Sequence, residues 1–304
     1  MRKTLILLLC ISTSIGFCQS KGDDYRKNGD LVSAIKAYKA TYIKDKNDSK
    51  NTYNLACAFA LTYQKDSAFY YLNIAIKNNA RLKVLTDNDL YPLTKDKRWK
   101  NIESQQLKKY QLKNGKLQNP IYAKQLLRLI MKDQALDYQQ DMARAYYMKN
   151  GEAPHWFYPI LDLKKEIGSQ NFTTMKQLIK KHGWPTYSMV GNLAADAPLL
   201  IINHLEGEEM RIKYLPLIKN ACLQKEGSCM EYAKIQDRIL VNTGKKQIYG
   251  MQFRYNKDRK LEPFPIVNPE YVDQKRKAIG LEPIKQYLKR KINYDWTIKQ
   301  QTKS

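Results

Sequence analysis

His204 is the titratable residue whose type and position best suit chemistry. It follows an apolar run at 199–203 and so stands at the end of an expected helix, where the helix dipole favours a charged imidazole. With Asp237 and Arg238, the sequence offers a base, a carboxylate to orient it and a guanidinium to hold an anion. This set predicts His204 and Asp237 as catalytic residues and Arg238 as a ligand-binding residue.

Four further side chains are candidates for binding a ligand in the same pocket. Gln247, Tyr249 and Gln252 fall in an expected strand, and Trp184 lies in a Gly-Trp-Pro turn. Gln247 and Tyr249 are two positions apart, so they would share one face of that strand. A buried polar network that only fixes the fold is the competing interpretation, and we favour it over catalysis. No GxSxG, HExxH or P-loop motif supplies the missing nucleophile, metal site or phosphate loop.

Three carboxylates recur at four-residue spacing and raise the question of a metal. Asp133, Asp137 and Asp141 could share one helix face and hold a cation. No histidine or turn ligands accompany them, so a solvated or ion-paired row is the favoured interpretation. We therefore predict no metal site and no cofactor.

An α-rich domain at residues 121–292 must position these side chains. Apolar spacing predicts one long helix from about 121 to 149, followed by a looped region at 152–170. Further helices are expected at about 172–181, 196–205, 208–225, 229–242, 269–277 and 283–291. Alternation within 246–267 predicts one small β-hairpin, and a loose polar tail is expected at 293–304.

Residues 19–104 are expected to form a separate front domain with a repeat period of 34. Ala34 aligns with Ala68, and Gly29 marks a turn that has no glycine in the second repeat. The pattern, over about 22–103, resembles the tetratricopeptide repeat, whose paired helices approach closely at small residues. The resemblance implies a short stack of helical hairpins, which could dock a protein partner or serve only as a scaffold.

A polar stretch rich in Lys and Gln separates the two domains. It covers residues 105–120 and contains the helix breakers Gly115 and Pro120, so we expect a linker. The whole chain is therefore predicted to be mainly α, with a tetratricopeptide-like hairpin stack followed by an α-rich domain that has one small β-hairpin.

Short motifs of the second domain resemble, in their order, a bacterial domain of unknown function. That domain is recognised by a Gly-Trp-Pro segment, a Gln-His pair, an Asp-Arg pair and a Tyr-Gly-Thr-Gln segment. Over about 125–290, and after Asp133-Gln134, this chain has Gly183-Trp184-Pro185, Asn203-His204, Asp237-Arg238 and Tyr249-Gly250-Met251-Gln252. Asn203 replaces the usual Gln, and Met251 the usual Thr. The resemblance implies the domain and no activity.

The N-terminus indicates export. Two basic residues precede a short apolar run, and residues 16–18 suit cleavage before Gln19, so a signal peptide is expected at 1–18. Lipidation of Cys18 is the less favoured alternative, because Phe17 precedes it where a small residue is usual. We expect a periplasmic or secreted protein without a transmembrane helix in the mature chain.

Cysteines and charge fit that compartment. Cys222 and Cys229 flank an expected turn, and a disulfide between them is possible outside the cytosol, whereas Cys57 is expected in a helical core. The formal net charge is +24, and removal of residues 1–18 takes away two cations and leaves +22. Such a chain suggests an anionic envelope component as partner, although Lys-rich faces also serve solubility. Nucleic acid is not expected, because no RNP, helix-turn-helix or zinc-finger pattern is present.

Two functions follow from these features. The favoured one is an exported binding or scaffold protein that docks a partner on its repeat surface and recognises a ligand in a polar pocket of the second domain. The alternative is an envelope hydrolase or transferase with a site centred on His204. Catalysis needs groups within hydrogen-bond reach, so the test is whether the candidate side chains gather in one open cleft.

Overall fold

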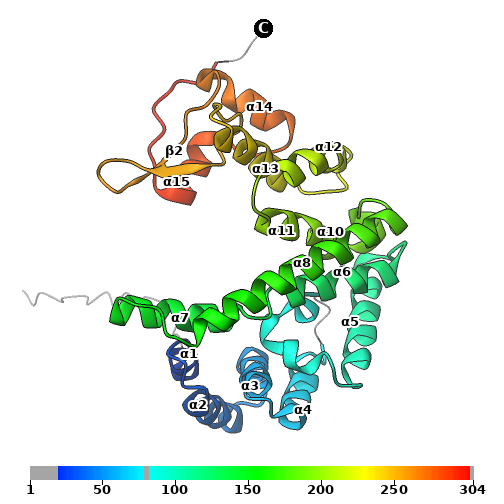
Figure 1. Ribbon diagram of the computed structural model, residues 1–304. Coiled ribbons are helices and arrows are strands. Elements are labelled where there is room, and N and C mark those ends of the chain that lie inside the picture. The colour runs from blue at the N-terminus through cyan, green and yellow to red at the C-terminus, as the bar shows by residue number, and fades with distance from the viewer. Residues whose placement is uncertain (1–19, 79–81, 302–304) are drawn as a thin grey trace, which may run out of the picture. The chain divides into compact units, whose positions relative to one another are not determined.

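The computed structural model describes residues 20–78 and 82–301, so the signal peptide expected at 1–18 lies outside the described residues, as does Cys18. The chain divides into two compact units, Met1–Lys77 and Asn78–Ser304. The described residues are mainly helical with one two-stranded hairpin, as predicted (Figure 1). None of the described helices is long and apolar enough to cross a membrane.

Helices of the first unit pack in pairs. They are α1 (Lys21–Lys27), α2 (Leu31–Lys44), α3 (Ser49–Leu61) and α4 (Lys65–Ala75), and each contacts the next. Ala34 and Ala68, which align in the sequence, are both fully buried. A methyl side chain at each of these positions leaves room for the neighbouring helix. The unit therefore consists of helical hairpins with small residues at equivalent positions.

Each hairpin turn places one residue in the left-handed region of backbone space. In the first turn it is Gly29, with a φ of 82°, and in the second it is Tyr63, with a φ of 58°. The two amides bond equivalently, to the carbonyls of Arg26 and Ala60. A tyrosine in this conformation carries a steric cost that glycine avoids. The Tyr63 ring is 70% exposed and so contributes little packing in return.

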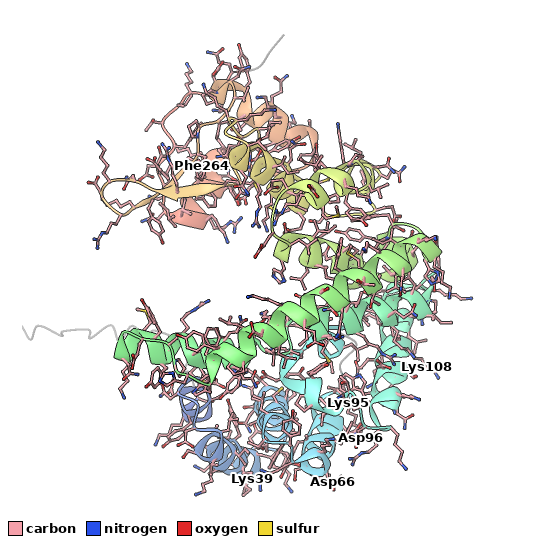
Figure 2. The ribbon with its side chains drawn as sticks, in the orientation of Figure 1. Lys39, Asp66, Lys95, Asp96, Lys108 and Phe264 are labelled. Carbon is pink, nitrogen blue, oxygen red and sulfur yellow. A yellow bond between two sulfur atoms is a disulfide. The ribbon has the colours of Figure 1, made fainter. Side chains whose placement is uncertain are left out.

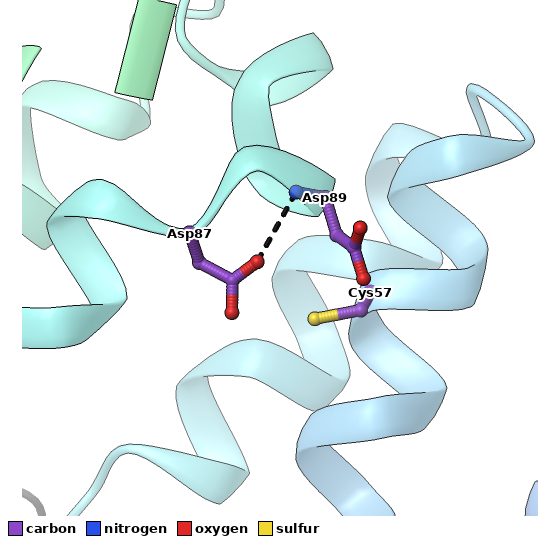
Figure 3. Close-up of side chains that lie close together, drawn as sticks. All are labelled: Cys57, Asp87 and Asp89. Atoms are coloured by element: carbon purple, nitrogen blue, oxygen red, sulfur yellow. Dashed lines mark hydrogen bonds between the residues drawn. The ribbon is translucent and has the colours of Figure 1, made fainter. Parts of the chain in front are cut away.

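The second unit begins with short segments that lead into the helix α5. They are η1 (Leu82–Thr86) and η2 (Asn88–Leu93), followed by α5 (Trp99–Asn114). Asp87 precedes η2 and accepts a hydrogen bond from the Asp89 amide at 3.1 Å (Figure 3). Both η1 and η2 contact α6 (Pro120–Asp133). This packing explains why the two units divide near residue 78 and not near 104.

The linker predicted at 105–120 is wrong for most of its length. Residues up to Asn114 form the second half of α5, which ends at Gly115 with a φ of 95°. Gln106 and Leu107 are buried on this helix. Lys and Gln are good helix formers, so the polar composition that suggested a linker also suits a helix.

The single helix predicted at 121–149 is wrong, because two helices cover this stretch. α6 ends at Asp133, and α7 (Asp137–Asn150) begins after a turn in which the Asp137 amide donates to the Gln134 carbonyl at 3.0 Å. The apolar spacing continues across the turn, so periodicity cannot mark the break. The break makes Asp133 a helix-end residue.

The loop predicted at 152–170 is also wrong. Most of it belongs to α8 (Phe157–His182), which is 26 residues long. Pro159 lies in the first turn, where an amide has no partner within the helix. Gly168 is tolerated inside the helix at a cost of about 1 kcal/mol. The helix stops before Gly183, as predicted.

α6 is the central helix of the next part of this unit, where it contacts α8, α10 (Asn192–Ala195) and α11 (Ala197–His204) (Figure 1). The elements after α8 are α9 (Tyr187–Val190), α10, α11, α12 (Glu209–Leu223) and α13 (Cys229–Asn242). The last three confirm the helices predicted at 196–205, 208–225 and 229–242. Cys222 and Cys229 form a disulfide that joins α12 to α13.

The β-hairpin is present but shorter than predicted. β1 (Phe253–Tyr255) pairs antiparallel with β2 (Leu261–Pro263). Residues 248–250 bend instead of extending the first strand, and Gln247 forms an isolated parallel bridge with Ile266. Phe264 follows β2, and the Arg254 guanidinium lies 5.6 Å from its ring centroid (Figure 2).

Three short helices close the second unit around an apolar cluster. The helices are η3 (Pro269–Tyr271), α14 (Val272–Ala278) and α15 (Ile284–Ile292). The buried members of the cluster are Ala233, Met251, Ile266, Val272, Ile284, Tyr287 and Leu288. They come from α13, the bend before β1, the segment after β2 and the C-terminal helices, so burial of apolar area links these segments.

The tail predicted to be loose is attached to this cluster over its described part. Tyr294 and Trp296 pack against the buried residues. The Gln300 side chain accepts a hydrogen bond from the Asp273 amide and donates one to an η3 carbonyl, each at 3.0 Å. The prediction of a loose tail is based on its polar average composition. It does not consider the large apolar area of Tyr294 and Trp296.

Candidate functional site

The predicted orientation of His204 by Asp237 is wrong, because Asp237 is occupied elsewhere. Its side chain is fully buried, and Oδ1 accepts hydrogen bonds from the amides of Ile248 at 2.7 Å and Tyr249 at 3.1 Å. Oδ2 accepts from the Met251 amide at 2.9 Å. Burial raises the pKa of Asp237, and these amide hydrogen bonds act against the rise. Asp237 therefore holds the turn after α13.

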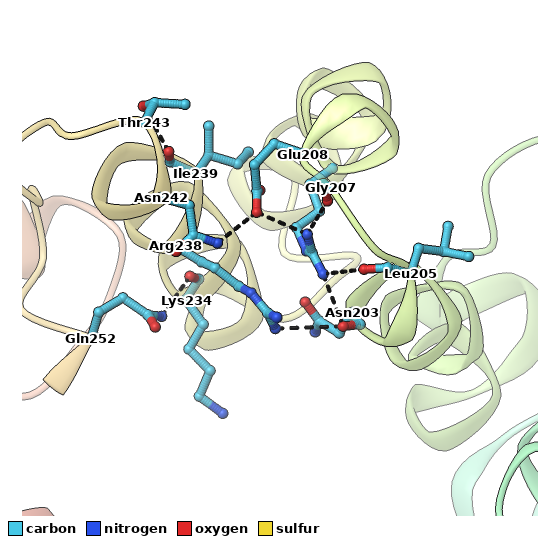
Figure 4. Close-up of polar contacts among 11 residues, drawn as sticks. Asn203, Leu205, Gly207, Glu208, Lys234, Arg238, Ile239, Asn242, Thr243 and Gln252 are labelled. Atoms are coloured by element: carbon cyan, nitrogen blue, oxygen red, sulfur yellow. Dashed lines mark hydrogen bonds and ion pairs between the residues drawn. The ribbon is translucent and has the colours of Figure 1, made fainter. Parts of the chain in front are cut away.

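Gln247 and Gln252 complete the same structural network. Gln247 is fully buried, and its Nε2 donates to the carbonyls of Gln252 at 3.1 Å and Phe264 at 2.8 Å. Its Oε1 accepts from the Gln252 amide at 2.9 Å. The Gln252 side chain in turn donates to the Lys234 carbonyl at 3.0 Å (Figure 4). These bonds favour the interpretation of a polar network that fixes the fold.

His204 pairs instead with Asp133, which lies 71 residues earlier in the chain. Nδ1 of the imidazole is 2.7 Å from Oδ2 of the carboxylate. The Asp133 side chain is 5% exposed, whereas that of His204 is 51% exposed. An ionised carboxylate can only accept, so Nδ1 is the donor of this bond, and in the neutral ring Nε2 then has a lone pair for another partner. A buried acid thus orients an accessible imidazole.

The elements explain how residues so far apart meet. Asp133 is the last residue of α6 and His204 the last of α11. These two helices contact each other, and both contact α8. The apolar faces of three packed helices therefore fix the distance between the two helix ends.

The backbone on both sides of His204 is held by Arg211 of α12. Nη2 of Arg211 donates to the carbonyls of Asn203 at 3.0 Å and Leu205 at 2.7 Å, and Nη1 donates to Glu208 Oε1 at 2.9 Å (Figure 4). The arginine is 2% exposed. It satisfies carbonyls that the end of α11 leaves without helical partners. Sequence reasoning missed Arg211, since nothing in the pattern separates it from the many surface cations.

Arg238 reaches the same region from α13. Its Nη1 lies 3.4 Å from the Asn203 carbonyl, at the long end of hydrogen-bond geometry (Figure 4). Burial lowers the pKa of Arg211, and the charge of Arg238 lowers it further. Arg238 thus lies close to the backbone next to His204, at the C-terminal end of α11.

A pocket of about 570 Å³ contains the His204 ring. α8 supplies an apolar wall from Leu161 and Phe172, and it adds Lys164, Lys165 and the hydroxyl residue Ser169. Sequence reasoning missed all of these, because most of them lie in the segment expected to be a loop. The correct signal is the three- and four-residue spacing from Leu161 onward, which the prolines and glycine of this segment obscured.

The two lysines of the pocket differ in their partners. Lys164 Nζ donates to Asp137 Oδ1 at 2.7 Å, so its charge is compensated. Lys165 Nζ is 3.9 Å from Asp162, and both of those side chains are about four-fifths exposed. Such a surface pair contributes little, so Lys165 remains available to an anion.

The row of three carboxylates does not gather around a cation. Asp133 bonds to His204, and Asp137 bonds to Lys164. The turn between α6 and α7 also separates Asp133 from Asp137 and Asp141, so the expected helical spacing is interrupted. The interpretation as an ion-paired row describes Asp137 correctly.

The remaining predicted ligand-binding residues lie elsewhere. The Tyr249 ring packs at 6.0 Å against Tyr232, and burial raises its pKa further above the ordinary value. The Trp184 ring lies 5.9 Å from that of Tyr214. Among the described residues that line the His204 pocket, none of Asp237, Arg238, Gln247, Tyr249, Gln252 and Trp184 is present. Of the predicted set, the pocket contains His204 alone.

The pocket has the groups for recognition of a polar ligand and one group for catalysis. An imidazole held by a carboxylate can accept a ligand hydrogen bond or serve as a general base. Within the described chain, Ser169 makes no hydrogen bond to His204, so the two do not form a nucleophile–base pair. The arrangement favours binding, or catalysis in which water is the attacking group.

A family model described as "Family of unknown function (DUF6624)" matches residues 120–299. The match agrees with the resemblance seen in the sequence over about 125–290. It includes Asp133, His204 and Arg211, and the α8 residues that line the pocket. No curated protein and no solved structure matches the chain.

Proposed function

The chain belongs to the DUF6624 family, whose function is unknown, and we propose that it is an exported binding protein. Its matched domain recognises a small polar or anionic ligand in the His204 pocket. One observation carries this proposal: a half-exposed imidazole is held at 2.7 Å by a buried carboxylate inside a pocket. Binding to a group that is already oriented avoids the entropy cost of ordering it.

The rest of the pocket supports a small ligand. Its volume of about 570 Å³ lies in the range of ligand sites, roughly 300–1,000 Å³. Leu161 and Phe172 offer apolar contact, while His204 and Lys165 offer a hydrogen bond and a positive charge. A few polar groups against an apolar wall are the usual composition of a small-molecule site.

The first unit supplies a docking surface in this proposal. Its hairpins are of the tetratricopeptide type, an assignment supported by the period of 34 and by the buried Ala34 and Ala68. Val32, Ile43 and Tyr70 are each at least 60% exposed, and exposed apolar side chains of this size favour contact with a protein partner.

Two properties of the chain support its export and an anionic partner. The Cys222–Cys229 disulfide is stable only outside a reducing compartment, which supports the export predicted from residues 1–18. The net charge, +24 for the whole sequence and +22 without residues 1–18, supports an anionic partner in the periplasm or the medium.

A thermal-shift screen of defined small anions, amino acids and sugars tests the pocket. The variants are His204→Ala and Asp133→Asn, and His155→Ala is the matched control because His155 is exposed and outside the pocket. A ligand at 100 times its Kd stabilises by about 2.7 kcal/mol, which raises Tm by several degrees. We expect a compound that stabilises the wild type and the control but neither pocket variant. The proposal is refuted if every stabilising compound protects His204→Ala equally, or if none stabilises the wild type.

Hydrolysis or group transfer is the second candidate, and the free Nε2 of an Asp-held histidine is the observation that favours it. His204 would take a proton from the attacking group, which is water in hydrolysis and an acceptor hydroxyl in group transfer, and would give that proton to the leaving group as its bond breaks, so no protein nucleophile is required. Incubation of each stabilising compound with the protein, followed by chromatography, distinguishes the two functions. Turnover that is lost in His204→Ala and kept in Ser169→Ala supports catalysis, whereas a compound recovered unchanged supports binding.

A further inference from the structure

A second pocket of about 450 Å³ lies in the second unit beside the start of α5. It shares no lining residue with the His204 pocket. Cations dominate its wall, and among the described residues of that wall Asp96 is the sole acid. The cations are Lys95, Lys97, Lys100, Arg128 and Lys132.

Arg128 forms a fixed and compensated part of this wall. Its Nε and Nη2 donate to the two carboxylate oxygens of Glu103 at 2.5 and 2.6 Å. The Glu103 side chain is only 2% exposed, so the pair is rigid. Hydrogen bonding to Glu103 raises the pKa of Arg128. The guanidinium therefore shapes the pocket without leaving a net charge.

Asp96 does not neutralise the lysines around it, because its carboxylate bonds to Arg98. Oδ1 accepts from the Arg98 amide at 2.9 Å and from Nε at 3.0 Å, and Oδ2 accepts from Nη2 at 2.7 Å. Leu93 and Trp99, at the two ends of this turn, are buried. The turn is thus anchored, and it carries Lys95 beside Asp96 (Figure 2), with Lys97 directly after Asp96 in the sequence.

Four lysines remain without a compensating charge. Lys95, Lys97 and Lys100 are exposed, and over the described part of the chain none of them forms an ion pair. Lys132 donates to the neutral Gln170 side chain at 2.7 Å. Like charges around one concavity repel each other and create a positive potential there. An anion that enters the pocket removes this repulsion.

We propose that this pocket binds a ligand with clustered phosphate groups. Each ammonium group carries three donors on a flexible stem and suits the dispersed oxygens of phosphate. Several lysines at one site match a multiply charged anion better than a single carboxylate. The proposal rests on the proposed function only in the anionic character of the partner, and it is independent of His204.

Isothermal titration of the purified protein with sodium tripolyphosphate tests the soluble form of this chemistry, and flotation with phosphatidylglycerol vesicles tests the lipid form. The pocket variant replaces Lys95, Lys97 and Lys100 with Gln. A matched control replaces Lys245, Lys257 and Lys260, which are exposed and outside the pocket, so that both proteins lose the same charge. His204→Ala is a third protein, which keeps this site intact.

We expect the wild type, the matched control and His204→Ala to bind one of the two probes alike. Binding of the pocket variant should be weaker by roughly tenfold or more, since each charge-assisted bond contributes about that factor. Binding of tripolyphosphate alone identifies a soluble ligand, and binding of vesicles alone identifies a lipid headgroup. Equal loss in the pocket variant and the control would show a net-charge effect and overturn the site, as would the absence of binding to both probes. Loss of probe binding in His204→Ala alone would show that the probe binds in the His204 pocket, which would also overturn this site.

Discussion

Replacement of Asp196 with Asn should remove a pH-dependent loss of stability. Asp196 lies between α10 and α11, and among the described residues no group donates to its buried Oδ1. Burial raises its pKa from the ordinary value of 3.8 to about 6, the charge of Glu231 contributes in the same direction, and Lys234 opposes both. The folded protein therefore favours the protonated acid.

The magnitude follows from the two pKa values. A rise from 3.8 to about 6 corresponds to roughly 3 kcal/mol. The side chain retains some exposure, and the N-terminus of α11 favours a negative charge by about 0.3–1 kcal/mol, so we expect about 1–2 kcal/mol. Because the folded pKa is higher than the unfolded one, this stability is present below 3.8, is lost as the pH rises to about 6, and changes little above that.

Urea denaturation between about pH 4 and pH 7.5 measures the effect. The difference in unfolding free energy between Asp196→Asn and the wild type should grow by about 1–2 kcal/mol across this window. Any change in unfolding free energy that the Asn side chain causes by itself is independent of pH, so it does not contribute to this growth. Asp162→Asn, at an exposed position, is the matched control and should show no such growth. A difference that stays constant with pH, or growth of the same size in the control, would refute the reasoning. Because the charge of Glu231 contributes to the raised pKa of Asp196, Glu231→Gln should make the pH-dependent loss of stability smaller.

Three further predictions concern stability and can be measured by urea denaturation. Tyr63→Gly should stabilise the first unit by about 1 kcal/mol, since it relieves a left-handed tyrosine, and a loss of stability would contradict this. Arg211→Met should cost about 3–5 kcal/mol because it leaves buried carbonyls without a donor and removes the cation beside Glu208, which keeps its hydrogen bond from Asn242. Arg238→Met, with one long hydrogen bond, should cost under about 1 kcal/mol, and equal costs would refute the role given to Arg211. Reduction of Cys222–Cys229 should cost about 2 kcal/mol from the short loop that it closes, and identical midpoints with and without reductant would contradict this.

Local signals predicted the parts of the fold that depend on neighbouring residues. The glycine after α8 predicted the end of that helix, and the aligned alanines of the first unit predicted close helix contacts. Both predictions are confirmed. Pro159 misled the assignment of α8, since a proline costs little in the first turn of a helix. The break after Asp133 left no local trace, because the apolar spacing is the same on both of its sides.

The candidate site was harder to predict because its parts are joined only by tertiary packing. His204 was identified by its chemistry, but its partner among the chain's carboxylates depends on how α6 and α11 pack. Asp237 carried an equally plausible sequence signal and proved to be saturated by backbone amides. Residue type shows what a side chain can do, whereas its available lone pairs depend on the backbone that folds around it.

The hydrogen bonds of Gln300 bear on where this domain can be cut. The side chain bonds to α14 and η3, and the Gln301 amide donates to the Glu270 carbonyl at 2.7 Å. A fragment that stops at Ile292, where the last helix ends, would lose these bonds and uncover the apolar face beneath Trp296. Such a fragment would tend to self-associate through that face. A domain boundary placed after Gln301 keeps these hydrogen bonds and the packing of Trp296.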